Sequence, residues 1–228
     1  MIVLAVHTSS PTLGLAVARD GTLIGETVVL SRHEHLEHTV PAIRELLLAL
    51  GIHIRAVDGF GVSLGPGSFS GVRVGLAAVK GMALALGRPA AGLCSLELAA
   101  YDALQPGETG LVFMDAKRDQ VFFASYCRTG DQLVNVEPPT IASLKDVPRT
   151  IALAQHQVVV WADKTAPPPD PIADAPYRIP TRPPALICAL LAHNRLARGL
   201  HDNLHALKPI YVRRPDAEER PTLLRANS

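Results

Sequence analysis

The stretch from Val57 to Leu86, VDGFGVSLGPGSFSGVRVGLAAVKGMALAL, constrains the fold of this chain more than any other. An apolar run over 57–64 meets a tight glycine loop at 65–68, and a long apolar helix follows. A strand, a glycine turn and a helix together aim backbone N–H groups and the positive end of a helix at an anion. The segment therefore predicts an α/β protein that carries either a phosphate site or a closely packed structural loop.

Gly65, Gly67 and Ser68, with Arg73 one turn into the helix, are the candidate residues of such a phosphate site. The spacing of Gly65, Gly67 and Gly71 is GxGxxxG, which differs from the dinucleotide fingerprint, and no Gly-Lys-Ser/Thr of a nucleotide-hydrolysing P-loop follows. The pattern therefore favours glycines that serve the turn and close packing. Arg73 remains a candidate either to complete an anion site or to pair with a carboxylate of a partner.

The bulk composition limits the classes of protein to which the chain can belong. Its 228 residues are 48% apolar and carry a net charge of +1, which argues against disorder and against a global field that recruits nucleic acid or membrane. Three widely separated cysteines fit a reducing cytoplasm better than a disulfide scaffold. The longest apolar region, 72–100, is interrupted by charged residues, so no membrane span and a cytoplasmic location are expected.

The first part of the chain, residues 1–105, predicts one domain with the element order β-β-β-α-β-α-β-α. A hairpin is expected where Asp20-Gly21 separates two strand-like runs, and glycines at 51 and 87 end two helices. The expected strands cover 2–6, 13–18, 22–30, 57–64 and 90–93, and the expected helices cover 36–50, 70–86 and 96–104.

A break at 105–107 opens a second domain over residues 106–228, which looks like a degenerate repeat of the first. Its expected elements are strands at 110–114, 120–127, 133–136 and 158–161, and helices at 143–147 and 185–198. The proline-rich stretch 167–184 predicts an extended surface loop, and a charged tail begins at Arg213.

Two helices of the first domain have more apolar surface than one sheet can cover. At 100° per residue, the core stripe of the longer helix is Val72, Leu76, Val79, Ala83 and Leu86, and its opposite face holds Val74, Ala78, Gly81 and Ala85. The stripe of the helix at 36–50 is Leu36, Val40, Ile43, Leu47 and Leu50, and its opposite face holds His38, Ala42, Glu45 and Ala49. The two outer faces are either a seam for helices of another subunit or are covered by the chain's own second domain.

Metal and nucleophile chemistry find little support in the sequence. His33, His35 and His38 do not have the His-Glu-x-x-His spacing of a zincin, and no GxSxG elbow is present. His201 and His205 would be i,i+4 partners in a helix but have no third ligand nearby in the sequence. No metal site is therefore expected. The charged turn 115–119 is either a solvated hairpin or part of a cleft between the domains.

Five stretches occur in the order and spacing of one family: HTSS, SRHEHLEHTVPAI, GVSLGPGSFSGVRVG, MDAKRDQVFFA and PIYVRRPDAEER. With them the whole chain resembles the bacterial TsaB (YeaZ) family. The resemblance implies an actin-like (ASKHA, ribonuclease-H-like) α/β fold of two lobes, each built on a mixed sheet flanked by helices. One departure is His7, where the family usually has Asp; an imidazole cannot replace the hard oxygen ligand that magnesium prefers.

The resemblance also implies a function in tRNA modification. It implies a non-catalytic scaffold for TsaD, the subunit that transfers a threonylcarbamoyl group to N6 of the adenosine 3′ of the anticodon in tRNAs reading codons that begin with A. TsaE is the further implied partner, tRNA is reached through the complex, and a homodimer forms when the protein is alone. No cofactor of its own is implied, although a nucleotide at the subunit junction stays open. The alternative is a metallopeptidase or an actin-like ATPase with its own catalysis.

Overall fold

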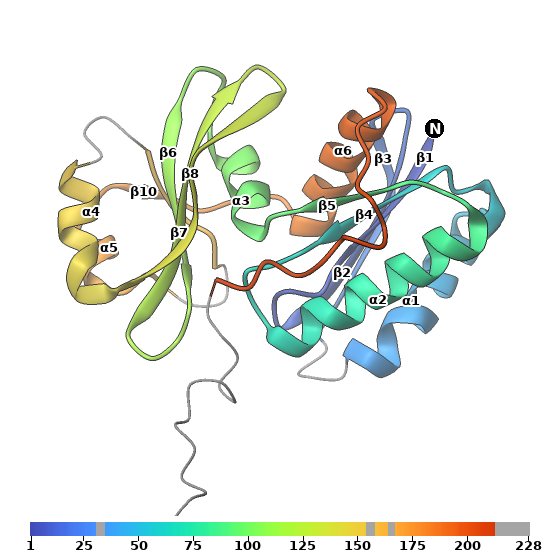
Figure 1. Ribbon diagram of the computed structural model, residues 1–228, viewed down its shortest axis with the longest axis horizontal. Helices are drawn as coiled ribbons and strands as arrows, with labels where there is room; N and C mark the ends of the chain where they lie inside the picture. The colour runs from blue at the N-terminus through green and yellow to red at the C-terminus, as the bar shows by residue number, and fades with distance from the viewer. Residues whose placement is uncertain (31–34, 154–157, 164–166, 213–228) are drawn as a thin grey trace, which may run out of the picture.

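A computed structural model of the chain describes residues 1–30, 35–153, 158–163 and 167–212. Two five-stranded sheets, each with helices against its faces, lie side by side and form two lobes (Figure 1). This arrangement confirms the expected two-lobed α/β class. His33 and the expected charged tail from residue 213 lie outside the described residues.

The first sheet has the strand order β3-β2-β1-β4-β5. Its strands are β1 (Ile2–His7), β2 (Thr12–Arg19), β3 (Thr22–Leu30), β4 (Gly59–Ser63) and β5 (Ala90–Leu93). The β1–β2 and β2–β3 pairs are antiparallel, as the Asp-Gly turn predicts, whereas β1–β4 and β4–β5 are parallel. The parallel pairs need crossovers, and helices supply them.

Helices α1 (His35–Ala49) and α2 (Phe69–Leu86) cover one face of this sheet, and α6 (Pro184–Ala197) covers the other (Figure 1). Ser68 caps the start of α2 by accepting a hydrogen bond from the N–H of Gly71, and Gly87 ends the helix in the left-handed conformation. The short 3₁₀ helix η1 (Ile54–Ala56) leads into β4, which therefore starts two residues later than the sequence predicts.

Small residues on one side of the sheet allow α6 to come close. In β4, a Cβ added to Gly59 would lie 2.5 Å from Leu196, and one added to Gly61 would lie 2.8 Å from the Cβ of Ala192. The larger neighbours Phe60 and Val62 point to the α1–α2 side. The alternation of large and small side chains along the strand therefore places α6 nearer to the backbone than bulky residues would permit.

The position of α6 corrects the expected division of the chain. Residues 106–228 were expected to form the second domain, yet α6 buries Ala185, Ile187 and Ala189 against the strands of the first sheet. The chain thus builds the second lobe and then returns to complete the first. Residues after α6 continue along the first lobe, where the N–H of Ile210 donates to the carbonyl of Leu64 over 2.8 Å.

The second sheet has the order β10-β9-β6-β7-β8. Its strands are β6 (Thr109–Asp115), β7 (Gln120–Thr129), β8 (Gln132–Ser143), β9 (Val158–Trp161) and β10 (Tyr177–Arg178). Helices α4 (Val147–Leu153) and α5 (Asp170–Ala173) cover one face, after the short 3₁₀ helix η2 (Leu144–Asp146). Two expectations are corrected here. The helix expected at 143–147 is β8 up to Ser143 and then η2, with α4 beginning only at Val147, and the expected loop 167–184 contains α5 and β10.

Helix α3 (Ser95–Ala103) joins the two lobes. Leu98 and Tyr101 pack with the α6 side of the first sheet, whereas Leu96, Ala99 and Ala100 pack against the second sheet. Nearly all of the helix is buried as a result.

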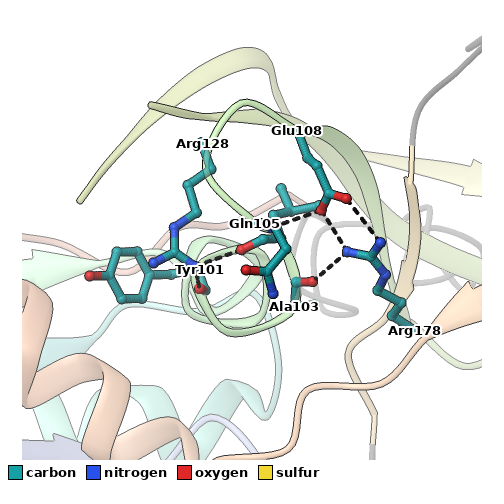
Figure 2. A network of polar contacts seen from close by, with 7 residues as sticks. Tyr101, Ala103, Gln105, Glu108, Arg128 and Arg178 are labelled. Atoms are coloured by element: carbon teal, nitrogen blue, oxygen red, sulfur yellow. Dashed lines mark hydrogen bonds and ion pairs between the residues drawn. The ribbon is translucent and has the colours of Figure 1, made fainter. Parts of the chain in front are cut away.

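Two arginines of the second lobe hold the carboxyl end of α3 (Figure 2). Arg128 donates to the carbonyls of Tyr101 and Leu104, and Arg178 donates to the carbonyl of Ala103 and forms a two-point ion pair with Glu108. Cations at the end of a helix satisfy its last carbonyls and its dipole. These contacts fix the second lobe against the first.

Candidate functional site

The outer face of α2 is open in the part of the chain that the structure describes. Val74 and Ala78 are half-buried, whereas Gly81 and Ala85 are exposed. A Cβ added to Gly81 would meet no described atom within 4 Å beyond its own helix. The opposite stripe is buried as predicted, at Val72, Leu76, Val79 and Ala83. The phase predicted for α2 is therefore confirmed.

The phase predicted for α1 is wrong in part: Ile43 and Leu47 are buried as predicted, but the buried side is rotated toward Ala42 and Leu46. Leu36 and Val40, expected in the core, are 76% and 61% exposed, and Ala42, expected on the outer face, is buried. The hydrogen bond from the imidazole of His35 to the carbonyl of Ser10, 3.0 Å, fixes the start of the helix with His35 inward. His38, Glu45 and Ala49 are exposed as expected. Because α1 is apolar on several sides, its sequence alone did not decide which side faces the sheet.

The correction enlarges the apolar surface of the first lobe. Leu36, Val40 and Leu48 of α1 and Leu84 of α2 are all more than half exposed, and the two helices lie side by side (Figure 1). Within the described ranges, α6 lies on the opposite face of the sheet. The segment after α6 contacts α2 at Arg73 and Lys80, and the four side chains stay exposed beside it. We call the exposed sides of these two helices the α1–α2 face.

The glycine loop is packed closely against the end of β1. A Cβ added to Gly67 would lie 2.1 Å from the carbonyl oxygen of Ser9, and one added to Gly71 would lie 2.0 Å from that of Thr8. The N–H of Ser68 donates to the Ser9 carbonyl over 2.7 Å. Gly65 has a φ of 90°, a backbone conformation that favours glycine. Close packing and turn geometry thus account for the glycines, and the Ser68 N–H is already engaged within the protein.

Arg73 contacts two aromatic residues. Its guanidinium stacks on the ring of Phe69, 3.7 Å from the ring centroid, and its Nε donates to the hydroxyl of Tyr211 over 2.8 Å. The sequence offered no sign of Tyr211 as a partner, because 138 residues separate the pair. In this structure Arg73 ties the segment after α6 to the start of α2.

His7 lies buried at the end of β1, beside Ser9 and Ser95. Burial, with a smaller contribution from His35, lowers the pKa of His7 from 6.5 to about 4, so the imidazole is neutral at pH 7. The Ser9 hydroxyl lies 2.8 Å from the Ser95 hydroxyl and 3.4 Å from Nε2 of His7. The cluster therefore provides neutral hydrogen-bonding groups and lacks the carboxylate that would suit magnesium.

A cavity of about 1070 Å³ lies between the lobes. The first lobe contributes His7, Ser9 and the glycine loop, and the second contributes Met114, Phe122 and the charged turn at Asp115 and Lys117. The turn expected either in solvent or at a cleft thus lies at the cavity rim. Sequence reasoning missed Ser95, Phe122 and Tyr211, because five or more separate segments build the lining.

The described residues contain no group of three or more His, Cys, Asp or Glu side chains placed to hold a metal ion. His201 and His205 lie in an irregular segment and a turn, so they are not the helical pair that the sequence allowed. Among the described residues, α2 is the one helix long and apolar enough by length and composition to cross a membrane, and a single such helix is weak evidence of a span.

Comparisons with known proteins place these features in a family. The family model described as "TsaD: tRNA N6-adenosine threonylcarbamoyltransferase" matches residues 28–164. An uncharacterized protein of Mycobacterium tuberculosis (strain ATCC 25618 / H37Rv) is 33% identical over 219 residues, which are 95% of this chain and 93% of that protein. The "tRNA threonylcarbamoyladenosine biosynthesis protein TsaB" of Bacillus subtilis (strain 168) is 34% identical over 147 residues, 64% of each chain.

Solved structures agree with this assignment. YeaZ from Pseudomonas aeruginosa superposes with a TM-score of 0.73 at 25% identity, over 92% of this chain and 99% of that one. The ROK hexokinase of Thermus thermophilus superposes with a TM-score of 0.53 at 13% identity, over 87% of this chain and 100% of that one, and shows the fold alone. These likenesses confirm the actin-like fold, and the chain belongs to the TsaB (YeaZ) family.

Proposed function

We propose that this protein is a non-catalytic subunit that binds TsaD through the α1–α2 face. In that complex it supports threonylcarbamoylation of N6 of the adenosine 3′ of the anticodon in tRNAs reading codons that begin with A. The family assignment and the name of the Bacillus subtilis relative support the tRNA-modification role. TsaE as a further partner, tRNA bound through the complex and a homodimer of the protein alone remain predictions.

The observation that carries this proposal is the exposed apolar α1–α2 face. Leu48 is 75% exposed and Leu84 is 51% exposed, on neighbouring helices. Burying a leucine side chain is worth about 1.5–3 kcal/mol, and contiguous apolar patches on a soluble protein commonly mark a contact surface. Two exposed helix faces would supply much of the area of a standard interface, which is roughly 800 Å² per partner.

The small residues of α2 favour helices as the partner elements. Ala78, Gly81 and Ala85 follow one another at spacings of three and four along the helix, so their backbone can be approached closely. The open space over Gly81 provides room for a side chain of another helix. Ala42 is withdrawn from the proposed interface because it is buried, and Leu36, Val40 and Leu48 take its place.

The chemistry of the cleft supports a non-catalytic role. The Ser68 N–H at the glycine loop bonds to the chain itself, and the residue at the end of β1 is a neutral imidazole. An actin-like ATPase would need a hard oxygen ligand and a phosphate cradle at these two places. ATP turnover by the isolated protein would contradict this part of the proposal.

The test of the docking face is Gly81→Arg. The long charged side chain occupies open space in the free protein, and replacing glycine within a helix raises helix propensity by roughly 0.5–1 kcal/mol, so the monomer stays folded. Mixed with TsaD, the variant is expected to weaken association at least about a hundredfold, measured by size exclusion with light scattering. Gln132→Arg, on the exposed β8, is the matched control and leaves association unchanged.

A second readout tests the biological role. Cells that depend on the Gly81→Arg protein are expected to lose threonylcarbamoyladenosine from total tRNA, whereas cells with the Gln132→Arg protein keep it. Persistence of the modified nucleoside after complete depletion of the protein would refute the proposed function. An intact complex of the Gly81→Arg protein with TsaD would refute only the docking face.

A further inference from the structure

The end of the first lobe that lies opposite the glycine loop carries several arginines. Strands β1, β4 and β5 are parallel to one another, so all three begin at this end, whereas the glycine loop follows the other end of β4. Helix α2 runs back from the loop and ends here at Gly87, and α6 ends here as well, because Leu196 lies beside Gly59. The N-terminus lies at this end, away from the second lobe (Figure 1).

Four separate segments each bring one arginine to this end. Arg19 ends β2 and pairs with Ile2 at the start of β1. Arg55 of η1 and Arg88 after α2 are neighbours, since the guanidinium of Arg88 donates to the carbonyl of Arg55 over 3.5 Å. Arg198 directly follows α6. We call the surface that carries Arg19, Arg55, Arg88 and Arg198 the basic end.

The carboxylates at the basic end offset only part of its positive charge. Asp58 accepts from the first N–H of β1 over 2.8 Å and lies 4.0 Å from the guanidinium of Arg88. Asp20 lies 2.5 Å from the amino group of the chain. In the segments 19–22, 53–58, 87–90 and 197–203, Asp202 is the one further acidic residue, and it accepts from a backbone N–H of β5 over 2.7 Å.

The guanidinium groups of Arg19, Arg55 and Arg198 are open to a ligand. All three residues are exposed, and within the described part of the chain no hydrogen bond or ion pair engages these groups. Arg195, one turn earlier in α6, differs because it bonds to Glu97 and to a carbonyl of β5. A guanidinium keeps its charge at any pH in the cell, and its donors match the geometry of phosphate oxygens.

Helix ends do not account for this arrangement. The dipole of α6 favours a cation after its last turn, which explains Arg198 alone. Arg19 ends a strand, and Arg55 lies in a three-residue 3₁₀ turn. The four segments also lack the apolar surface of a protein contact, because Leu200 is their one large apolar side chain that is exposed. Unpaired arginines on a mostly polar surface are typical of contact with phosphate groups.

From these observations we propose that the basic end binds the phosphate backbone of the tRNA that the complex modifies. The inference rests on the proposed function, which supplies tRNA as the nucleic acid present. Because Arg88 directly follows α2, the basic end adjoins the α1–α2 face, and one RNA can contact this chain and TsaD together. Contacts between arginines and phosphates add affinity and orientation without reading the base sequence.

The test replaces Arg55 and Arg198 by glutamine in one protein. Binding of a full-length tRNA that reads a codon beginning with A is measured by fluorescence anisotropy over a range of salt concentrations, with the complex with TsaD and with the chain alone. The double variant is expected to bind tRNA at least about fivefold more weakly at low salt, and its salt dependence, as the slope of log K against log salt, to fall by roughly 1–2. Arg149→Gln, exposed on α4 of the second lobe, is the matched control and leaves both unchanged.

Unchanged tRNA affinity and salt slope in the double variant, or an equal loss in Arg149→Gln, would overturn the inference. Loss of association with TsaD would also overturn it, because the basic end would then contact protein. Thermal unfolding of each variant shows that a weaker site is not an unfolded one. Failure of the unchanged protein to associate with TsaD contradicts the proposed function, whereas a failed basic end leaves that complex intact, and the titrations of the chain alone test the basic end in either case.

Discussion

Helices α2 and α6 pack on opposite faces of the same sheet, but they differ in how much of their surface the rest of the chain buries. Both are rich in apolar residues, yet α6 is enclosed from Ala185 to Ala189, whereas α2 leaves Gly81, Leu84 and Ala85 exposed. The second lobe and α3 lie on the α6 side, whereas the described segment after α6 contacts α2 at Phe69, Arg73 and Lys80 and leaves Gly81, Leu84 and Ala85 exposed. An apolar helix side that the described chain leaves exposed is typical of a surface that contacts another molecule.

The largest expected difference in stability is between replacing a leucine of α6 and replacing a leucine of α2. Leu191→Ala in α6 removes a buried side chain and leaves a cavity, so it is expected to lower the free energy of unfolding by about 2–5 kcal/mol. Leu84→Ala in α2 is expected to change it by less than about 0.5 kcal/mol, because that side chain is exposed. Urea unfolding of the monomer measures both. Equal losses would mean that the two helices are equally buried.

The next effect concerns His7, which lies on the α6 side of the sheet opposite Gly14. Because the folded protein lowers the pKa of His7 from 6.5 to about 4, the unfolded chain binds more protons between these values. Stability due to His7 is complete above pH 6.5 and is lost as the pH falls toward 4, by up to about 3 kcal/mol.

This loss is measured as the pH dependence of urea unfolding between pH 4 and 7. His7→Gln removes the titrating group, so its stability is expected to fall less steeply over that interval, whatever its stability at pH 7. Parallel curves for the two proteins would show that the α6 side does not keep His7 neutral.

A smaller effect compares two glycines. Gly61→Ala places a Cβ 2.8 Å from that of Ala192 and 3.2 Å from the carbonyl of Cys188, so α6 must shift, at a cost of about 1–3 kcal/mol. Gly81→Ala meets open space and is expected to stabilise the monomer by roughly 0.5–1 kcal/mol through helix propensity. In both thermal and urea unfolding, Gly61→Ala should therefore lower the stability of the monomer and Gly81→Ala should raise it. A stabilising Gly61→Ala would show that α6 is not pressed against the sheet.

The smallest effect tests the corrected phase of α1. Leu36→Gln exchanges an exposed apolar side chain for a polar one, and the stability of the monomer is expected to change by less than about 0.5 kcal/mol. The matched change Ile43→Gln puts an amide into the core and should be far more damaging. A large loss for Leu36→Gln would restore the phase first predicted for this helix and shrink the α1–α2 face.

The sequence predicted the buried side of α2 better than that of α1, for a physical reason. In α2, the large residues Val72, Leu76 and Val79 lie on one side and the opposite side carries mainly glycine and alanine, and the predicted phase is confirmed. In α1, leucines at 36, 46, 47 and 48 point in several directions, and either of two sides could pack on the sheet. The hydrogen bond of His35 to Ser10 and the packing of Ala42 decide between them.

The placement of α6 had a sequence signal that was missed. Gly59 and Gly61 alternate with Phe60 and Val62 in β4, which marks a strand whose second face is approached closely by another element. That signal predicts cover on the second face but does not say which segment supplies it. The helix that does so begins more than 120 residues after β4 ends.

Local rules were sufficient for the strands and helix ends of the first sheet and for the close-packed glycine loop, because hydrogen bonding, capping and backbone sterics act between residues near one another in the chain. In the second lobe, the length of β8, the position of α4 and the presence of α5 and β10 were not predicted. The phase of α1, the return of α6 to the first lobe and the cavity with Ser9 and Ser95 in its lining arise from contacts between distant segments. Those contacts depend on how whole elements fit together in space, and no short stretch of residues carries that information.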